Sequence, residues 1–234
     1  MTDSSLGHNA IGFSFLLPCA AAANGGLQDD NGHGGENEDD AAGDSEHFSL
    51  CYTTGMQRPR CHWCNLNNPL YVTYHDEEWC VPVHDERKLF ELLVLESFQS
   101  GLSWECVLNK RKAFRRAFAG FDPTKVARFN EDRIDALLAD PGIIRHRAKI
   151  AAAIANAKCF IQIQREAGSF DAYIWSFTKG QVIRENHRVR SPLSDTISKD
   201  LKRRGMKFVG SVTIYSFLQA IGILNSHEPG CWLS

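Results

Sequence analysis

Two residues near the end of the sequence have the spacing of half a metal site. His227 and Cys231, in the stretch SHEPGCW, are separated by three residues. Histidine nitrogen and cysteine sulfur are the ligands that zinc takes in tetrahedral sites, and four of them close the shell. The alternative for this pair alone is an exposed histidine and an unrelated thiol, because short Cys/His spacings are common by chance. A metal site therefore needs a second pair of ligands elsewhere in the chain.

The stretch RPRCHWCNLNNPLYVTYHDEEWC offers such a second pair. Its candidate ligands are Cys61, His62, Cys64, His75 and Cys80. Any two of them would complete a tetrahedral shell with the C-terminal pair. The metal would then join segments that are far apart in the sequence, where loop-closure entropy is largest. With four protein ligands and no open position, its role would be structural and not catalytic.

One carboxylate falls on an apolar helical face. Glu96 follows Leu89, Leu92 and Leu93 by seven, four and three residues, so it shares their side of a predicted helix. A carboxylate in such a place loses solvation and needs either a partner or a purpose. The ordinary alternative is a position at the edge of the stripe or an ion pair with a nearby arginine.

The surroundings of Glu96 favour a ligand pocket. The stretch ESFQSGLSW adds Gln99, a glycine that permits close approach, and Trp104. Further aromatic residues are concentrated in a 17-residue stretch upstream: Trp63, Tyr71, Tyr74 and Trp79. Aromatic side chains are usually part of a core, but this density beside candidate metal ligands is consistent with the wall of a pocket.

A basic hairpin is predicted over residues 137–154, LLADPGIIRHRAKIAAAI. A turn at Pro141–Gly142 separates two helices, and free amide groups at the start of the second one suit a phosphate. The cationic or potentially cationic residues around this point are Arg145, His146, Arg147 and Lys149. Contacts of this kind position a protein on DNA without reading its sequence. The alternative is an ordinary helical hairpin with a basic face.

Charge is segregated along the chain. Residues 1–57 contain no Lys or Arg and nine of the 28 acidic residues, which leaves 19 acidic against all 26 basic residues in 58–234. The basic main part suggests a polyanionic partner, although solvated helix faces are an alternative. Residues 24–50 are rich in Gly, Asn, Asp and Glu, so we expect them to be disordered.

The sequence gives little sign of secretion or of membrane insertion. The apolar run of residues 11–23 is too short to span a bilayer, and no positive charge precedes it as in a signal peptide. We therefore expect an intracellular protein without a membrane partner. In that compartment the eight cysteines are metal ligands or buried thiols and not disulfides.

The main part of the chain predicts an all-α fold, without sustained strand alternation or internal repeats. Asp85, Ser103 and Asn130 are expected N-caps, and the Asp122–Pro123 and Ser191–Pro192 pairs are typical helix starts. A long helix is expected from about residue 143 to residue 165, and FDAYIWSF predicts a short one. The stretch SVTIYSFLQAIGIL is apolar nearly all round and predicts a buried central helix.

Several stretches of the chain, in their order along the sequence, resemble the DNA-3-methyladenine glycosylase I family. This family is a branch of the helix-hairpin-helix base-excision glycosylases. The matching stretches are RCHWC, NPLYVTYHDEEW, KLFELLVLESFQSGLSW, FDPTKVA, GIIRHRAKI, WSF and SKDLKRRGMKFVGSVTIYSFLQAIGILNSHEPGC. They cover about residues 58–232. The resemblance implies a glycosylase domain at 58–234, an all-α helix-hairpin-helix fold whose two ends form a zinc-stapled subdomain. Residues 1–57 are then a disordered acidic N-terminal extension.

The resemblance also assigns roles to residues. It places the ligands of one structural Zn²⁺ on Cys61, His75, His227 and Cys231, the base-recognising carboxylate on Glu96 and the stacking ring on Trp104. Expected alongside them in base binding are Tyr71, Tyr74, Trp63, Trp79 and Gln99. The expected contacts to the DNA backbone are Gly142, Arg145, Arg147 and Lys149. Glu96 is the expected catalytic residue, and Asp171 is expected not to act at the sugar.

The implied activity is hydrolysis of the N-glycosidic bond of 3-methyladenine in alkylated double-stranded DNA by a monofunctional, monomeric glycosylase. The implied location is the cytoplasm or nucleoid of a bacterium, or the nucleus of a eukaryote. The alternatives are a non-catalytic, zinc-stapled module that binds alkylated DNA and a zinc hydrolase using His75 and Asp76. Two positions where the family usually has glycine are Cys80 and Ser97 here, and a longer gap before His75 leaves Cys64 as a conceivable ligand.

Overall fold

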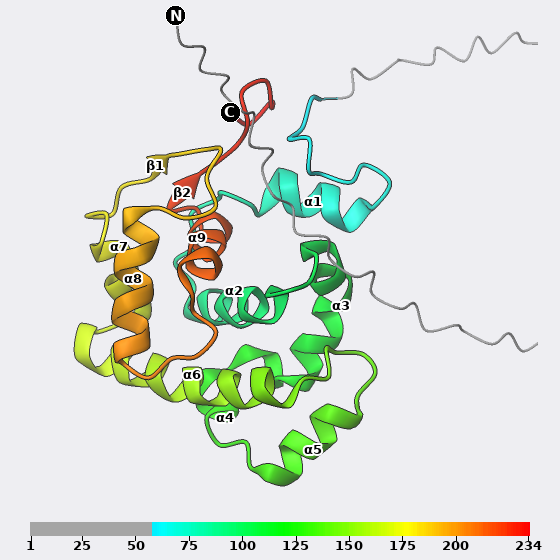
Figure 1. Ribbon diagram of the computed structural model, residues 1–234, viewed down its shortest axis with the longest axis vertical. Helices are drawn as coiled ribbons and strands as arrows, with labels where there is room; N and C mark the ends of the chain where they lie inside the picture. Colours follow the sequence, from blue (N-terminus) through cyan, green and yellow to red (C-terminus); the bar gives the residue numbers. More distant parts are fainter. Residues whose placement is uncertain (1–57) are drawn as a thin grey trace, which may run out of the picture. The chain divides into compact units, whose positions relative to one another are not determined.

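The computed structural model describes residues 58–234, and the expectation of a disordered segment at 1–57 lies outside the described residues. In chain order the elements are α1 (Pro69–Glu77), α2 (Glu86–Gln99), α3 (Trp104–Ala117), the 3₁₀ helix η1 (Ala119–Phe121), α4 (Pro123–Val126), α5 (Glu131–Ala139), α6 (Arg147–Ala167), α7 (Phe170–Ser176), β1 (Ile183–Arg184), α8 (Pro192–Arg203), α9 (Ser211–Ala220) and β2 (Leu224–Asn225). Over these residues the prediction of a mostly helical fold is confirmed (Figure 1).

The predicted helix starts agree with the structure. The side chains of Asp85, Ser103 and Asn130 each accept a hydrogen bond from the backbone N–H three residues later, at the starts of α2, α3 and α5. Ser191 caps α8 in a reciprocal pair with Ser194. Such caps satisfy amide groups that would otherwise lack partners in the first turn, and each contributes about 1 kcal/mol.

The helix α6 begins later than the sequence suggested. It starts at Arg147 and not near residue 143, because residues 141–146 form a turn and an extended connection. The amide of Gly142 donates to the Asp140 carboxylate at 2.7 Å. His146 is the N-cap, and its Nδ1 accepts a hydrogen bond from the amide of Lys149 at 3.3 Å. One first-turn amide of α6 is therefore already satisfied within the protein.

The helices α2 and α9 form the centre of the described part. The helix α2 packs against α3, α6, α7 and α9, and α9 packs against α8 as well (Figure 1). Ile214, Phe217 and Leu218 of α9 are completely buried, as predicted for a central helix. Because α2 is enclosed on several sides, a side chain that it carries has a well-defined position.

Segments from the two ends of the described chain lie together. The amide of Trp232 donates to the Pro59 carbonyl at 2.8 Å. Nearby in the chain, the strand β2 pairs in parallel with β1, with Ile183 opposite Leu224. Figure 1 shows the C-terminal segment beside the segment that precedes α1. A two-residue strand is too short to give an alternation signal, so the sequence did not predict this small sheet.

Within residues 58–234, no helix is both long and apolar enough for a transmembrane span.

Candidate active site and metal centre

Four side chains from the two ends of the described chain form a compact cluster. Cys61, His75, His227 and Cys231 are all buried, and one donor atom from each lies within 4.8 Å of the others. Cys61 Sγ lies 3.6 Å from His227 Nδ1, and Cys231 Sγ lies 3.5 Å from the same nitrogen and 3.6 Å from His75 Nε2. In a tetrahedral zinc site with its usual bond lengths, S and N ligand atoms are about 3.5 Å apart. The donor set and its spacing therefore fit one tetrahedral metal ion.

A carboxylate orients one of the histidines. Asp76 Oδ1 lies 2.8 Å from His75 Nδ1, and Arg60 donates to both oxygens of Asp76. The hydrogen bonds from Arg60 hold the pKa of Asp76 well below its usual range, so this carboxylate is charged and accepts a hydrogen bond from His75 Nδ1–H. The other nitrogen, Nε2, is then unprotonated and faces the cluster, which is the arrangement typical of metal-binding histidines.

The other candidate ligands lie outside the cluster. Cys64 Sγ is directed at the Tyr71 carbonyl, 3.9 Å away. Cys80 Sγ accepts a hydrogen bond from the amide of Ser226 at 3.2 Å. His62 is exposed and pairs with Glu228. The structure thus resolves the choice that the sequence left open, because only Cys61 and His75 of the N-terminal candidates meet the C-terminal pair.

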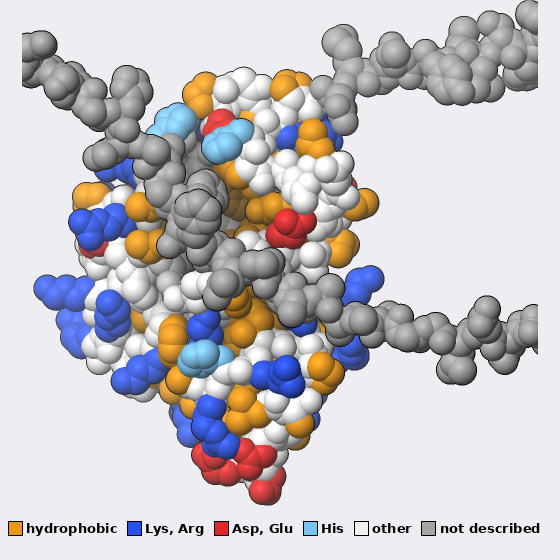
Figure 2. Space-filling view, turned by 45° about the vertical axis from the view of Figure 1, so that its right-hand side comes forward, with side chains coloured by type: hydrophobic (Ala, Val, Ile, Leu, Met, Phe, Trp, Pro, Cys, Tyr) orange, Lys and Arg blue, Asp and Glu red, His pale blue; other side chains and the backbone are white. Residues whose placement is uncertain are grey.

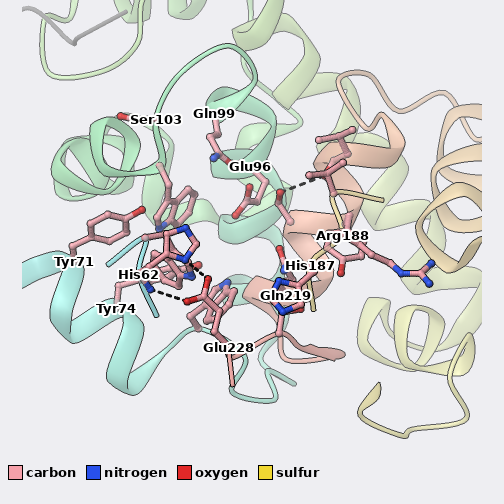
Figure 3. A pocket seen from close by; sticks show the side chains of 18 residues that line it. His62, Tyr71, Tyr74, Glu96, Gln99, Ser103, His187, Arg188, Gln219 and Glu228 are labelled. Carbon is pink, nitrogen blue, oxygen red and sulfur yellow. Dashed lines mark hydrogen bonds and ion pairs between the residues drawn. The ribbon is translucent and has the colours of Figure 1, made fainter. Parts of the chain in front are cut away.

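A cavity of about 350 Å³ lies beside the cluster. All seven residues expected to bind the base line it: Trp63, Tyr71, Tyr74, Trp79, Glu96, Gln99 and Trp104. In Figure 3, Tyr71 and Tyr74 of α1 lie on one side of the cavity, His187 and Arg188 lie on the other, and Glu96 of α2 lies between them. Residues from α1, α2 and α3 that are distant in the sequence therefore share one pocket.

The aromatic rings form a wall that continues into the metal cluster. Tyr74 and Trp104 have ring centroids 5.1 Å apart. Trp63 meets Trp79 edge-on at 4.6 Å and packs against His75 at 5.3 Å. The rings of this wall are held by one another and by the cluster, so their orientation does not depend on a ligand in the cavity.

Glu96 is the most unusual group in the cavity. Its side chain is only 4% exposed, and its Oε2 has no hydrogen-bond partner. Burial raises the pKa of this carboxyl to about 8, since no cation contributes to stabilising its charged form. The indole Nε1 of Trp104 is also buried without a partner. An unpaired acceptor and an unpaired donor on one cavity wall are typical of groups that a ligand satisfies.

The two departures from the family pattern have structural explanations. Ser97 is buried, its hydroxyl donates to the Leu93 carbonyl at 2.8 Å, and it does not line the cavity. Cys80 has a φ of 63°, in the left-handed region where glycine is favoured. Its buried thiol accepts the Ser226 amide hydrogen bond, which offsets part of the backbone strain. Neither substitution places a new polar group in the cavity.

The basic hairpin differs from expectation at one residue. Lys149 is buried, and its Nζ donates to the carbonyls of Phe98 and Ser100 at 2.9 and 2.6 Å. This ammonium fixes the C-terminal end of α2, so the expected phosphate contact of Lys149 would require these two bonds to break. Burial lowers the pKa of Lys149 without removing these bonds.

The rest of the hairpin remains accessible. Arg147 forms ion pairs with Glu131 and Asp135 of α5, Arg145 is exposed, and Gly142 is partly buried. Figure 2 shows Lys and Arg side chains mainly at the left edge and in the lower part of the face presented there, with acidic side chains grouped at the lower tip where α5 lies. Arg145 is therefore open to a phosphate, whereas the Gly142 amide is already bonded to the Asp140 carboxylate.

Asp171 lies elsewhere. Its carboxylate is 2.8 Å from His84 Nδ1, the ring of His84 stacks on Trp175, and neither of the paired residues lines the cavity. This position agrees with the expectation that Asp171 does not act at the sugar.

Part of the cavity wall was not anticipated from the sequence. It includes His187, Arg188, Val189, Val212, Tyr215, Ser216, Gln219 and Ser226. Several of these residues lie on α9, whose sequence predicted only a core helix. The polar residues within that apolar stretch were the available signal, because a helix buried on every side has no need of Ser216 or Gln219.

Comparison with solved structures defines the class of protein. The chain is similar to the crystal structure of a 3-methyladenine DNA glycosylase I, with a TM-score of 0.72 and 44% identity, covering 74% of this chain and 98% of the other. A structure from Staphylococcus aureus, described as the structural basis of 3-methyladenine recognition, gives a TM-score of 0.69 and 37% identity and covers 71% and 92%. The fold is therefore that of the 3-methyladenine DNA glycosylase I structures.

The sequence comparisons are more specific. Residues 63–234 match the model of the methyladenine glycosylase family, and the chain belongs to this family. It is 46% identical to the DNA-3-methyladenine glycosylase 1 of Escherichia coli K12 over 178 residues, which are 74% of this chain and 95% of the relative. It is 40% identical to a DNA-3-methyladenine glycosylase of Haemophilus influenzae, covering 74% and 96%. The family predicted from the sequence stretches is thereby confirmed.

Proposed function

We propose that this protein is a base-excision repair glycosylase that hydrolyses the N-glycosidic bond of 3-methyladenine in alkylated DNA. It releases the free base and leaves an abasic site. The observation that carries the proposal is the unpaired oxygen of Glu96, which is buried in a cavity walled by Tyr74 and Trp104. The names of the relatives support the same substrate, and one solved relative is described as a complex with 3-methyladenine.

Glu96 and the aromatic rings suit a cationic base. Methylation at N3 gives adenine a positive charge, and a damaged base is cheaper to extrude from the helix than a well-paired one. Trp104 and Tyr74 would stack on this cation, with a gain of roughly 0.5–2 kcal/mol per favourable contact. Glu96 would accept a hydrogen bond from the exocyclic amine. Burial keeps the Glu96 carboxyl protonated below about pH 8 in the free protein, and a cationic base would stabilise its charged form. A neutral base would not, so the pocket favours the alkylated one.

The chemistry then needs little further help from the protein. The bond between the sugar and a methylated base is labile because the base leaves as a neutral molecule. Water adds to the sugar carbon and loses a proton, and the electrons of the broken bond remain with the base. Glu96 is the expected catalytic residue in this proposal, because it holds the extruded base in the cavity with its labile glycosidic bond open to water.

The metal cluster fits one structural Zn²⁺. Cys61, His75, His227 and Cys231 would hold the ion, which would supply a cross-link between the two ends of the domain. The four ligands leave no open position for a reacting water. This geometry argues against the zinc hydrolase alternative, and it supports a zinc-stapled subdomain in a glycosylase domain at 58–234.

Double-stranded alkylated DNA is the proposed partner of a monomeric enzyme. Support comes from the net positive charge of residues 58–234 and from the helical hairpin of α5 and α6, where Arg145 is exposed. The Gly142 amide would have to exchange its hydrogen bond to Asp140 for a phosphate contact. Arg147 would have to exchange its ion pairs with α5 for such a contact. An intracellular site of action, at the DNA, follows from this activity.

An assay for base release tests the proposal. Methylated duplex DNA is incubated with the protein, and the released bases are separated by chromatography and identified by mass spectrometry. We expect 3-methyladenine and an equal amount of abasic sites. Binding to methylated DNA without release of any base would instead support the non-catalytic binding module.

A further inference from the structure

A short basic segment borders the cavity on the side opposite the tyrosines. Residues 184–190, RENHRVR, connect β1 to α8 and are called the basic loop below. They include three arginines and one glutamate. His187, Arg188, Val189 and Arg190 are all exposed. None of these residues belongs to the hairpin of α5 and α6, so the basic loop is a separate cationic element.

Arg188 has a distinctive position in this loop. Among the lining residues within 58–234, it is the only Lys or Arg. Figure 3 shows its side chain at the edge of the cavity and directed away from Glu96. A base held against Glu96 remains attached to its sugar, and the phosphates on either side must therefore lie at the cavity edge. Arg188 is the permanent cation nearest to that path among the lining residues.

The backbone of the basic loop is fixed at both ends. The amide of Glu185 donates to the Asn225 carbonyl at 3.1 Å, and the hydroxyl of Ser226 donates to the Glu185 carbonyl. At the other end the amide of Ser191 donates to Ser194 Oγ at 2.9 Å. A loop held in this way loses little conformational entropy when its side chains bind a partner.

The side chains of the loop are available for a partner. The side chain of Arg188 is 57% exposed, and its ion pair with Glu185 is long, at 3.6 Å. An exposed ion pair of this kind contributes little free energy, so the guanidinium can leave Glu185 to bind another anion. Val189 and Val212, on the same edge, are 54% and 56% exposed. Exposed apolar residues beside exposed cations are typical of a contact surface.

We propose that the basic loop is a second DNA-contacting element, in which Arg188 and Arg190 bind phosphates of the damaged strand next to the extruded nucleotide. This inference rests on the proposed function, because it requires a nucleotide in the cavity. The guanidinium group matches a phosphate in charge and geometry. The hairpin of α5 and α6 would hold the duplex, and the basic loop would hold the distorted strand at the site of excision.

The salt dependence of DNA binding tests the inference. The probe is a duplex with a stable abasic-site analogue, and the dissociation constant is measured between 50 and 300 mM NaCl for wild type and for Arg188→Ala/Arg190→Ala. Each lost phosphate contact lowers the slope of log K against log salt by about 1, so the double variant should lose about 2. Arg188→Lys/Arg190→Lys should retain most of the slope, because it retains the charge.

A matched control removes the same charge elsewhere. Lys125→Ala/Arg165→Ala eliminates two exposed cations on α4 and on the last turn of α6, away from the cavity, and should leave the slope unchanged. An unchanged slope in the loop variant, with normal base release by wild type, would overturn the inference and leave the proposed function intact. An equal loss in the control would overturn it also, because the effect would be general. Failure of wild type to release any base would instead remove the proposed function, and this inference with it.

Discussion

The indole of Trp79 meets the imidazole of His227 edge-on, with ring centroids 4.8 Å apart. Trp79 lines the cavity, and His227 belongs to the metal cluster. Trp63 makes a second connection of the same kind through His75. The cluster and the cavity are therefore packed together, and any movement of the cluster histidines is expected to displace the aromatic wall of the cavity.

Removal of one cluster cysteine should reduce both metal content and stability. We expect Cys61→Ala to lose bound zinc and to lower the melting temperature by roughly 10 °C, because a change of 1 kcal/mol shifts a domain of this size by about 2–4 °C and a lost structural metal costs several kcal/mol. Affinity for DNA with a damaged base should fall as well, through the packing of Trp63 and Trp79. Elemental analysis and calorimetry provide the two measurements.

Cys64→Ala is the matched control for this change. Cys64 is also buried and lies three residues away, but its thiol faces the Tyr71 carbonyl and not the cluster. The control should keep a full equivalent of zinc and lose only the small amount of stability expected for a buried thiol. Equal zinc loss in the two variants would contradict the assignment of Cys61 as the ligand.

Substitution of Glu96 should affect base release far more than duplex binding. Glu96→Gln keeps the shape of the side chain and removes the carboxyl group that can ionise when the cationic base binds. A hydrogen bond to a charged group is worth about 1.5–3 kcal/mol, so we expect base release to fall by roughly 10- to 100-fold, and Glu96→Ala to lose at least as much. Glu77→Gln, at an exposed position on α1, should have no effect. Single-turnover release of 3-methyladenine checks the difference, and a wild-type rate in Glu96→Gln would remove the proposed role.

The same substitution should increase stability, and by an amount that depends on pH. Burial raises the pKa of Glu96 from 4.5 to about 8 in the folded protein. Between these values the folded state holds a proton that the unfolded state has lost, so the free energy of unfolding falls as pH rises, by up to about 1.4 kcal/mol per pH unit. Above pH 8 the loss is complete. The glutamine side chain of Glu96→Gln does not titrate, so the stability difference between this variant and wild type should increase in favour of the variant from pH 5 to pH 8.5. Melting temperatures at both pH values test this, and a constant difference would show that Glu96 keeps an ordinary pKa.

Local signals in the sequence predicted much of the fold. Asp85, Ser103 and Asn130 mark helix starts because their side chains bond to amides only three residues away, and such contacts can be read from neighbouring letters. Glu96 was found in the same way, since its spacing from Leu92 and Leu93 determines the helix face on which it lies. The four cluster residues needed the family resemblance, because the spacing of the cysteines alone did not exclude Cys64.

Long-range contacts could not be predicted. Lys149 was expected at a phosphate because it stands in a basic run, but its ammonium is satisfied by carbonyls of Phe98 and Ser100, about fifty residues earlier in the chain. The contribution of α9 to the cavity was also missed. An apolar helix is expected to be buried, but its sequence does not show that one of its faces borders a cavity. The left-handed backbone conformation at Cys80 could not be predicted from the sequence, because cysteine rarely adopts it.

Gly222 provides the sharpest test of how the region around the cavity is held. It has a φ of +74°, and a Cβ added there would lie 2.4 Å from the backbone nitrogen of Pro82 and the carbonyl carbon of Val81. Gly222→Ala must push this segment away from α9 and break the hydrogen bond from the Val83 amide to the Ile221 carbonyl, 3.0 Å long.

Gly168 offers a comparison in which the strain is present without the clash. It has a φ of +86° at the end of α6, with no atom within 4 Å of an added Cβ. Gly168→Ala should therefore lose only the 1–2 kcal/mol typical of a left-handed alanine, or roughly 2–8 °C in melting temperature. Gly222→Ala adds overpacking of roughly 1–3 kcal/mol or more to that strain, and it should also weaken DNA binding, because the displaced segment begins next to Trp79. Thermal unfolding of both variants checks the order. Equal losses of melting temperature would mean that the backbone of residues 81 and 82 can move aside at no cost. The close approach of Gly222 would then not hold the wall of the cavity.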